Sequence, residues 1–210
     1  MKKKIAILGS TGSIGKTLIN LLKQDKNKFE IILLTSNTNY KELLKQVKLF
    51  DVKNIIINDY KVFLYVKKIL KNHKKNIYNK FDNMDKIFTK KIDYSMCAIA
   101  GFEGLKPTLD IIKYTKKIAI ANKESIICGW SLIRKNIKKY KSEFIPIDSE
   151  HFSIWSLMNN SESSKIEKVF ITASGGPFKD FPIKDFKFIT PKQALKHPSW
   201  SMGKKISIDS

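Results

Sequence analysis

Short apolar runs alternate with amphipathic stretches along the first two thirds of the chain. The apolar runs have the length of buried strands and cover residues 4–9, 29–34, 54–57, 94–100, 117–121 and 144–147. The intervening stretches carry apolar residues at helical spacing and cover residues 14–22, 40–50, 60–70 and 103–114. Parallel strands need a crossover that returns over the face of the sheet, so this alternation predicts an α/β fold built from βαβ units around a parallel sheet.

The pattern is weaker in two other regions. Residues 71–91 are rich in Lys and Asn and predict an irregular connection with room for one short strand. The texture changes after residue 150, where we expect a helix at about 150–159, a strand at 169–173, a short helix near 191–196 and a last strand at 205–208. We therefore place a domain boundary near residues 147–150.

Charge is the most unusual feature of the composition. Lys and Arg number 40 against 19 Asp and Glu, a formal net charge of +21. The lysines are scattered from end to end and form no single basic stripe interleaved with aromatic residues, so we expect solvated faces and no nucleic-acid partner. A nucleic-acid-binding module is kept as an alternative.

No apolar run approaches the roughly 20 residues that a membrane-spanning helix needs, so no membrane partner is expected. The amino-terminal lysines lead directly into the first strand, without the apolar core and cleavage site of a signal peptide, which favours an unprocessed cytoplasmic protein. Cys97 and Cys128 lie in apolar surroundings without a CxxC pair, and we expect both to be reduced core residues.

A glycine-rich segment, Gly9-Ser10-Thr11-Gly12-Ser13-Ile14-Gly15, lies between the first predicted strand and helix. Its glycines permit a tight turn, and the helix start presents free amides to a pyrophosphate, which predicts a dinucleotide site. The second strand is followed by no acidic residue before Glu42, and this absence favours NADP over NAD. Between the end of this second strand and Lys41 there is also no Arg or Lys that could bind the extra phosphate of NADP.

Further chemistry-bearing residues follow predicted strands. Asp148 and Glu150, with Ser149 between them, offer oxygen ligands that Mg²⁺ or Mn²⁺ prefers, although Asp-Ser-Glu also serves as a helix cap. Lys123 follows the strand at 117–121 and is expected to reach the same crevice.

Two loops in the last third offer binding groups of another kind. Ser174 and the adjacent glycines can cradle a phosphate, although a plain turn has the same sequence. The predicted loop from His197 to Gly203 contains Trp200 and Met202, residues that normally pack in cores, so it is either a flap over a substrate or a loop packed on the domain.

Together the strings GSTGSIG, ANKES, IDSEH, TASGGPF and HPSWSMGKKISIDS occur in the order typical of the 1-deoxy-D-xylulose 5-phosphate reductoisomerase family. The chain resembles that family from Lys4 to its last residue. The resemblance implies a Rossmann-type doubly wound parallel sheet that binds NADPH (1–147), followed by part of an α+β catalytic domain (148–210). It also implies a homodimer at full length and a role in the methylerythritol phosphate route to isoprenoids.

The same resemblance implies roles for individual residues. The implied NADPH contacts are Thr11, Gly12, Ser13, Ile14, Asn122, Glu124 and Gly203. The implied metal ligands, for Mg²⁺ or Mn²⁺, are Asp148 and Glu150. The implied substrate contacts are Lys123, Ser149, Ser174, His197 and Ser210, with Trp200 and Met202 in a closing flap. Lys123, Asp148, Glu150 and His197 are the expected catalytic residues.

The implied reaction is a metal-assisted rearrangement of 1-deoxy-D-xylulose 5-phosphate, followed by hydride transfer from NADPH, to give 2-C-methyl-D-erythritol 4-phosphate. Members of the family continue past the position of Ser210 with further phosphate ligands, a third metal carboxylate and a helical domain. We therefore expect these 210 residues to bind NADPH poorly or moderately and to turn over little substrate. The alternatives are a non-catalytic nucleotide-binding fragment and another NADP-dependent oxidoreductase, such as a semialdehyde dehydrogenase, for which neither cysteine has the context of a nucleophile.

Overall fold

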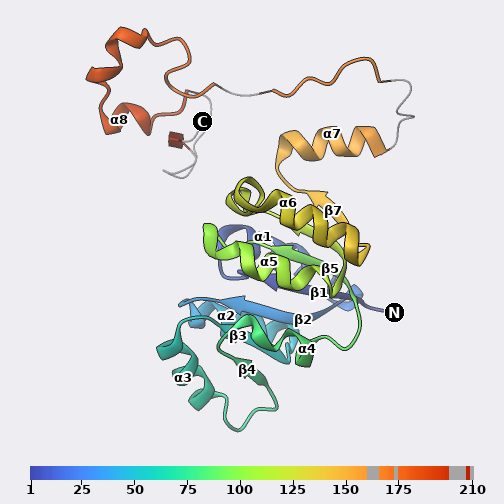
Figure 1. The fold of residues 1–210 in the computed structure, drawn as a ribbon. Coiled ribbons are helices and arrows are strands. Elements are labelled where there is room, and N and C mark those ends of the chain that lie inside the picture. The colour runs from blue at the N-terminus through green and yellow to red at the C-terminus, as the bar shows by residue number, and fades with distance from the viewer. Residues whose placement is uncertain (160–165, 173–174, 199–206, 209–210) are drawn as a thin grey trace. The chain divides into compact units, whose positions relative to one another are not determined.

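The computed structural model describes residues 1–159, 166–172, 175–198 and 207–208. The chain divides into two compact units, Met1–Trp155 and Ser156–Ser210, each of which is described by itself (Figure 1). The expected domains 1–147 and 148–210 place their boundary slightly earlier and remain a prediction.

The first unit is built on a seven-stranded sheet with the strand order β4-β3-β2-β1-β5-β6-β7 (Figure 1). Its strands are β1 (Lys3–Leu8), β2 (Phe29–Ser36), β3 (Asn54–Ile57), β4 (Asn76–Tyr78), β5 (Ile92–Cys97), β6 (Thr115–Ile120) and β7 (Glu143–Pro146). Every neighbouring pair is parallel, which confirms the predicted α/β class. The chain first builds outward from β1 to β4 and then returns to the other side of β1 with β5. The sheet therefore has a topological switch point between β1 and β5.

Helices cover both faces of this sheet. The α-helices of the unit before β7 are α1 (Ser13–Gln24), α2 (Tyr40–Phe50), α3 (Tyr60–Ile69), α4 (Met84–Ile87), α5 (Leu105–Ile112) and α6 (Lys123–Tyr140). Short 3₁₀ turns η1 (Lys26–Lys28), η2 (Phe81–Asn83) and η3 (Phe102–Gly104) join them to the strands.

The two faces of β1 enter different hydrophobic cores. Ile5 and Ile7 pack with residues of α1, α2 and α3, whereas Ala6 and Leu8 pack with residues of α4, α5 and α6. Successive side chains of a strand point to opposite faces, so a strand covered on both faces is apolar at every position. This double burial explains the continuous apolar runs in the sequence and confirms the doubly wound arrangement.

The 18-residue helix α6 was not predicted from the apolar pattern. Its buried positions are Ser125, Gly129 and Ile133, whereas Ile127 and Leu132 are exposed, so its apolar residues do not mark its buried face. The weakly patterned region 71–91 contains β4, η2 and α4. The prediction that Cys128 is a core residue is wrong, because its side chain is exposed on α6. Cys97 is buried as expected, and burial raises the pKa of its thiol to about 12 against a smaller opposite effect of a hydrogen bond with Thr108.

The remaining elements are α7 (Ser149–Asn159), η5 (Ile183–Phe188) and α8 (Pro191–Ala194). α7 and α8 confirm the helices predicted at 150–159 and near 191–196. The strand predicted at 169–173 is wrong over its described residues 169–172, which belong to no sheet, and residue 173 lies outside the described residues. Of the strand predicted at 205–208, residues 207–208 are helical, and the others lie outside the described residues. None of the described helices is long and apolar enough to cross a membrane.

Candidate functional site

The glycine-rich segment forms a tight turn between the end of β1 and the start of α1. Gly9 has a φ of 80°, and a Cβ atom there would lie 2.6 Å from the Ala98 carbonyl oxygen on the adjacent strand end. A Cβ at Gly15 would lie 2.4 Å from the Gly9 carbonyl oxygen, so this glycine lets α1 pack directly on the turn. The turn thus requires glycine at its first and last positions for two different geometric reasons.

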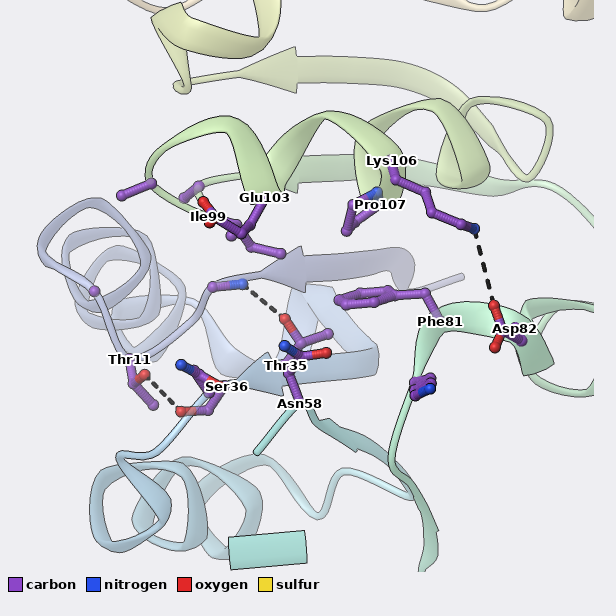
Figure 2. Close-up of a pocket in the computed structure, with 16 residues that line it drawn as sticks. Thr11, Thr35, Ser36, Asn58, Phe81, Asp82, Ile99, Glu103, Lys106 and Pro107 are labelled. Atoms are coloured by element: carbon purple, nitrogen blue, oxygen red, sulfur yellow. Dashed lines mark hydrogen bonds and ion pairs between the residues drawn. The ribbon is translucent and has the colours of Figure 1, made fainter. Parts of the chain in front are cut away.

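The end of β2 fixes the conformation of this turn. The Gly9 amide donates to Thr35 Oγ1 at 2.8 Å, and the Ser10 amide donates to the Thr35 carbonyl at 3.0 Å. The hydroxyls of Thr11 and Ser36 lie 2.9 Å apart and form a hydrogen bond beside the turn (Figure 2). The turn is therefore held in one shape before any ligand arrives.

The first turn of α1 presents backbone amides with no side-chain cap. Gly12 occupies the N-cap position and cannot supply a capping oxygen. The first amides of a helix have no partner within the helix, and they lie at the positive end of its dipole. Ser13 and Ile14 therefore begin a helix whose amino terminus fits a pyrophosphate.

A cavity of about 830 Å³ opens beside this turn, at the carboxyl ends of β1, β2, β3 and β5 (Figure 2). This is the switch point at which open α/β sheets bind their ligands. The residues lining the cavity are Gly9, Thr11, Gly12, Thr35, Ser36, Asn37, Asn58, Lys80, Phe81, Asp82, Ala98, Ile99, Ala100, Glu103, Lys106 and Pro107. Of the expected NADPH contacts, Thr11 and Gly12 belong to this lining, and Ser13 and Ile14 directly follow them. Size, position and glycine turn all fit a dinucleotide.

The cavity also has a wall that the motifs did not indicate. Phe81 and Asp82 of η2 line it together with Lys106 of α5 (Figure 2). Lys106 Nζ lies 2.7 Å from the Asp110 carboxylate and 3.8 Å from that of Asp82. The hydrogen bond with Asp110 is the largest influence and raises the pKa of Lys106, burial opposes it, and the charges of Asp110 and Asp82 add smaller upward effects. An ion pair thus joins η2 to α5 at the cavity.

Asn122 holds a loop of the cavity in place. Its buried side chain caps α6 by accepting from the Ser125 amide at 2.7 Å. The side-chain Nδ2 of Asn122 donates to the Gly101 carbonyl at 2.6 Å and to the Ile99 carbonyl. The Asn122 side chain therefore stabilises the start of α6 and the adjacent loop. Its contact with NADPH remains a prediction. Glu124, at the second position of α6, is partly buried, and its expected contact is likewise untested.

A carboxylate cluster lies at the end of β7. Asp148 Oδ1 accepts from the His151 amide at 3.0 Å and lies 2.6 Å from His151 Nδ1. Partial burial raises the pKa of Asp148, but the hydrogen bonds from His151, with the charges of His151 and Lys123, lower it further, so the net shift is downward. Asp148 is therefore ionised at neutral pH, the form that a metal ligand needs. His151 is a component of this cluster that the residue assignments did not include.

The metal-ligand prediction fits these residues in part. The partly buried Glu150 follows Asp148 in the first turn of α7, so the chain brings two oxygen donors of the kind that Mg²⁺ and Mn²⁺ prefer to one helix start. Within the described residues, no group of three or more His, Cys, Asp or Glu is arranged to hold a metal ion. Asp148 and Glu150 would supply two of the oxygen donors that such a site needs, and their role as metal ligands remains a prediction.

The other predicted site residues are placed as follows. Lys123 begins α6, and its charge is the smallest of the influences that lower the pKa of Asp148. Its expected position in a common crevice with Asp148 remains a prediction. His197 belongs to the second unit and is buried. Ser174, Trp200, Met202, Gly203 and Ser210 lie outside the described residues, as does the side chain of Ser149.

Two protein-family models match the chain. The model for 1-deoxy-D-xylulose 5-phosphate reductoisomerase matches residues 5–129, and the model for the carboxy-terminal domain of the same enzyme matches residues 144–210. Curated relatives with that enzyme name include the protein of Pelagibacter ubique, 64% identical over 99% of this chain and 54% of its own length. The protein of Wolbachia pipientis subsp. Culex pipiens (strain wPip) is 40% identical over 99% of this chain and 53% of its own length.

Solved structures of the same enzyme share the fold. The enzyme of Zymomonas mobilis in complex with NADPH superposes with a TM-score of 0.87 at 31% identity, covering 100% of this chain and 54% of that one. A complex of the enzyme with NADPH, fosmidomycin and magnesium superposes with a TM-score of 0.81 at 32% identity, over 99% of this chain and 54% of that one. The chain thus spans about half the length of the relatives it matches. With two family models covering most of its residues, the chain belongs to the 1-deoxy-D-xylulose 5-phosphate reductoisomerase family.

Proposed function

We propose that this chain supplies the NADPH-binding domain (1–147) and part of the catalytic domain (148–210) of an enzyme that converts 1-deoxy-D-xylulose 5-phosphate to 2-C-methyl-D-erythritol 4-phosphate. One observation carries the proposal. A cavity with a glycine-rich turn lies at the switch point of the sheet, in a chain whose fold matches a family member solved with NADPH. The enzyme acts on a sugar phosphate, in the cytoplasm and as a homodimer at full length.

In this proposal NADPH lies in the cavity with its pyrophosphate against Thr11, Gly12, Ser13 and Ile14. The fixed turn and the uncapped start of α1 provide amides for the phosphate oxygens without reorganisation. Asn122, Glu124 and Gly203 complete the proposed contacts. NADPH, when bound, supplies the hydride of the reduction.

Asp148 and Glu150 are the proposed ligands of Mg²⁺ or Mn²⁺, which supplies Lewis-acid stabilisation of negative charge on the substrate oxygens. His151 holds the Asp148 carboxylate in one orientation through its amide and Nδ1. Lys123 is the proposed group that assists proton movement at a substrate hydroxyl. Its charge also lowers the pKa of Asp148, which supports a position near the proposed metal ligands. Ser149, Ser174, His197 and Ser210 are the proposed substrate contacts, with Trp200 and Met202 in a flap that excludes water.

The experiment is an assay of NADPH oxidation by the full-length protein, with 1-deoxy-D-xylulose 5-phosphate and Mn²⁺. We expect oxidation that requires both additions. Asp148→Asn should abolish the effect of Mn²⁺ on substrate affinity while NADPH still binds. The matched control is Asp85→Asn, which neutralises an exposed carboxylate on α4, and it should behave as the wild type.

The outcome that contradicts the proposal is a full-length protein that binds NADPH but leaves it unoxidised with substrate and metal present. That result would favour a nucleotide-binding protein without this activity. Oxidation with another substrate, and none with deoxyxylulose phosphate, would favour a different NADP-dependent oxidoreductase.

A further inference from the structure

NADPH differs from NADH by a phosphate on the adenosine ribose, and this phosphate has to be recognised by the chain. In doubly wound folds that ribose lies at the carboxyl end of the second strand. Here β2 is followed by Ser36-Asn37-Thr38-Asn39, which is uncharged. The segment does not repel the extra phosphate, but it offers no positive charge to attract it. The cation has to come from another element.

We propose that Lys80 is the residue that recognises the additional phosphate of NADPH, and this inference rests on the proposed NADPH function. Lys80 follows β4 and lines the same cavity as Ser36 and Asn37. Its ammonium lies on a flexible stem of four carbons, which lets the charge reach toward a phosphate across the cavity mouth. Together, the hydroxyl of Ser36, the amide of Asn37 and the cation of Lys80 form a set that fits a phosphate.

The backbone that carries Lys80 is fixed to the end of β3. The side-chain amide of the preceding residue, Asn79, donates to the Ile57 carbonyl at 2.9 Å and to the Asn58 carbonyl at 3.2 Å. β3 is the direct neighbour of β2 in the sheet, and its last residue Ile57 pairs with Ser36. Asn79 thus holds the Lys80 backbone beside the strand that adjoins the ribose-binding end of β2.

The other cation of the cavity lining is already neutralised. Lys106 is bonded to Asp110 at 2.7 Å and lies 3.8 Å from Asp82. Lys80 forms no ion pair within the described part of the chain. The carboxylates of the lining are Asp82, which pairs with Lys106, and Glu103, which belongs to η3 before α5. Lys80 is therefore the lining residue with positive charge to spare for a ligand.

The test is a binding titration of the full-length protein with NADPH and with NADH, which differ only in the phosphate concerned. Lys80→Gln should weaken NADPH binding about tenfold, the effect of losing one charge-assisted hydrogen bond, and change NADH binding by less than about twofold. Lys80→Arg should keep the preference for NADPH, because it keeps the charge. Lys80→Gln should likewise weaken competition by 2′,5′-ADP, which carries the phosphate, and leave competition by 5′-AMP nearly unchanged. This pair of competitors tests the phosphate without the nicotinamide.

Two lysine variants serve as controls. Lys86→Gln removes the same charge six residues further on, at an exposed position of α4 that is not part of the cavity, and should leave both affinities unchanged. Lys41→Gln tests the rival cation in the first turn of α2.

The outcomes separate the inference from the proposed function. If Lys80→Gln still prefers NADPH to the same degree, or if Lys41→Gln removes the preference instead, Lys80 is not the recognition residue although NADPH binding stands. If the wild-type full-length protein binds neither nucleotide, the proposed NADPH site and the role of Lys80 both fail.

Discussion

A single buried side chain braces the glycine-rich turn from a distant helix. Gln46 of α2 is 2% exposed, and its Nε2 donates to the Ser10 carbonyl at 3.0 Å and to Glu42 Oε1 at 3.2 Å. Its Oε1 is buried without a hydrogen-bond partner. A buried oxygen without a partner is costly, so this glutamine supports the turn at some expense to the fold.

We predict that Gln46→Met separates ligand affinity from stability. Methionine has a similar length and removes the unpartnered oxygen of Gln46, but it also leaves the buried Ser10 carbonyl without this donor. The two effects oppose each other, so the free energy of unfolding should change by less than about 1 kcal/mol. The affinity for NADPH should fall about three- to tenfold, because the turn loses a bond that fixes its shape. Denaturant unfolding and a nucleotide titration measure the two quantities.

The control for this prediction is Gln24→Met at the exposed carboxyl end of α1, which should change neither the free energy of unfolding nor the affinity for NADPH. Unchanged NADPH affinity in Gln46→Met would show that Gln46 has no part in positioning the turn.

Some site residues were predictable one by one, and others were not. Thr11 and Gly12 were predictable because the glycine spacing and the preceding apolar run define the turn at which they lie. Lys80 and Phe81 were not, because they follow a three-residue strand in a Lys- and Asn-rich region without a periodic pattern. Their proximity to the turn arises from the sheet order, which no local pattern contains.

At the level of elements, two glycines of the strand–turn–helix unit have different roles: Gly15 allows close packing of the backbone, and Gly12 leaves space in the cavity. A Cβ at Gly15 would meet backbone atoms at 2.4 Å, whereas a Cβ at Gly12 has its nearest neighbour at 3.5 Å, an ordinary contact. Gly12 lines the cavity, and Gly15 does not.

We therefore predict opposite effects of two alanine substitutions. Gly15→Ala should destabilise the fold by about 1–3 kcal/mol, because the turn and α1 have to move apart. Gly12→Ala should change stability by less than about 1 kcal/mol but weaken NADPH binding about tenfold or more, because the added methyl enters the space for the pyrophosphate. Thermal unfolding and nucleotide titration of the two variants provide the comparison, and an equal loss of stability in both would contradict it.

Strands buried on both faces were predicted well because most of their buried residues are apolar. The failures have the opposite origin. Val169, Phe170 and Ile171 form an apolar run typical of a strand, yet their side chains are 50%, 80% and 66% exposed. In α6 the buried face contains a serine and a glycine, so its burial left no apolar signal. Apolarity predicts an element only where it coincides with burial.

At the scale of the whole molecule, the net charge of +21 opposes folding through repulsion between lysines. The ion pairs between described residues involve exposed side chains for the most part and offset little of it.

We predict that the melting temperature rises when the ionic strength is raised from about 0.01 M to about 0.15 M, because the Debye length shortens from about 30 Å to about 8 Å. Differential scanning calorimetry measures the effect, and NaCl and KCl should act equally if screening is the cause. A melting temperature that is constant or falls with salt would show that attractive ion pairs outweigh the repulsion.

The strand order also determines how the chain assembles during synthesis. β1 is made first but lies inside the sheet, and one of its edges is completed by β5, as the bond from the Lys4 amide to Asp93 illustrates across 89 residues. Until β5 leaves the ribosome, a growing chain carries an apolar strand with an open edge, the kind of edge at which nascent proteins aggregate. The cavity is likewise incomplete before residue 107 has been made. A nucleotide can therefore stabilise the folded domain by binding to it, but it cannot stabilise the intermediates that form earlier during synthesis.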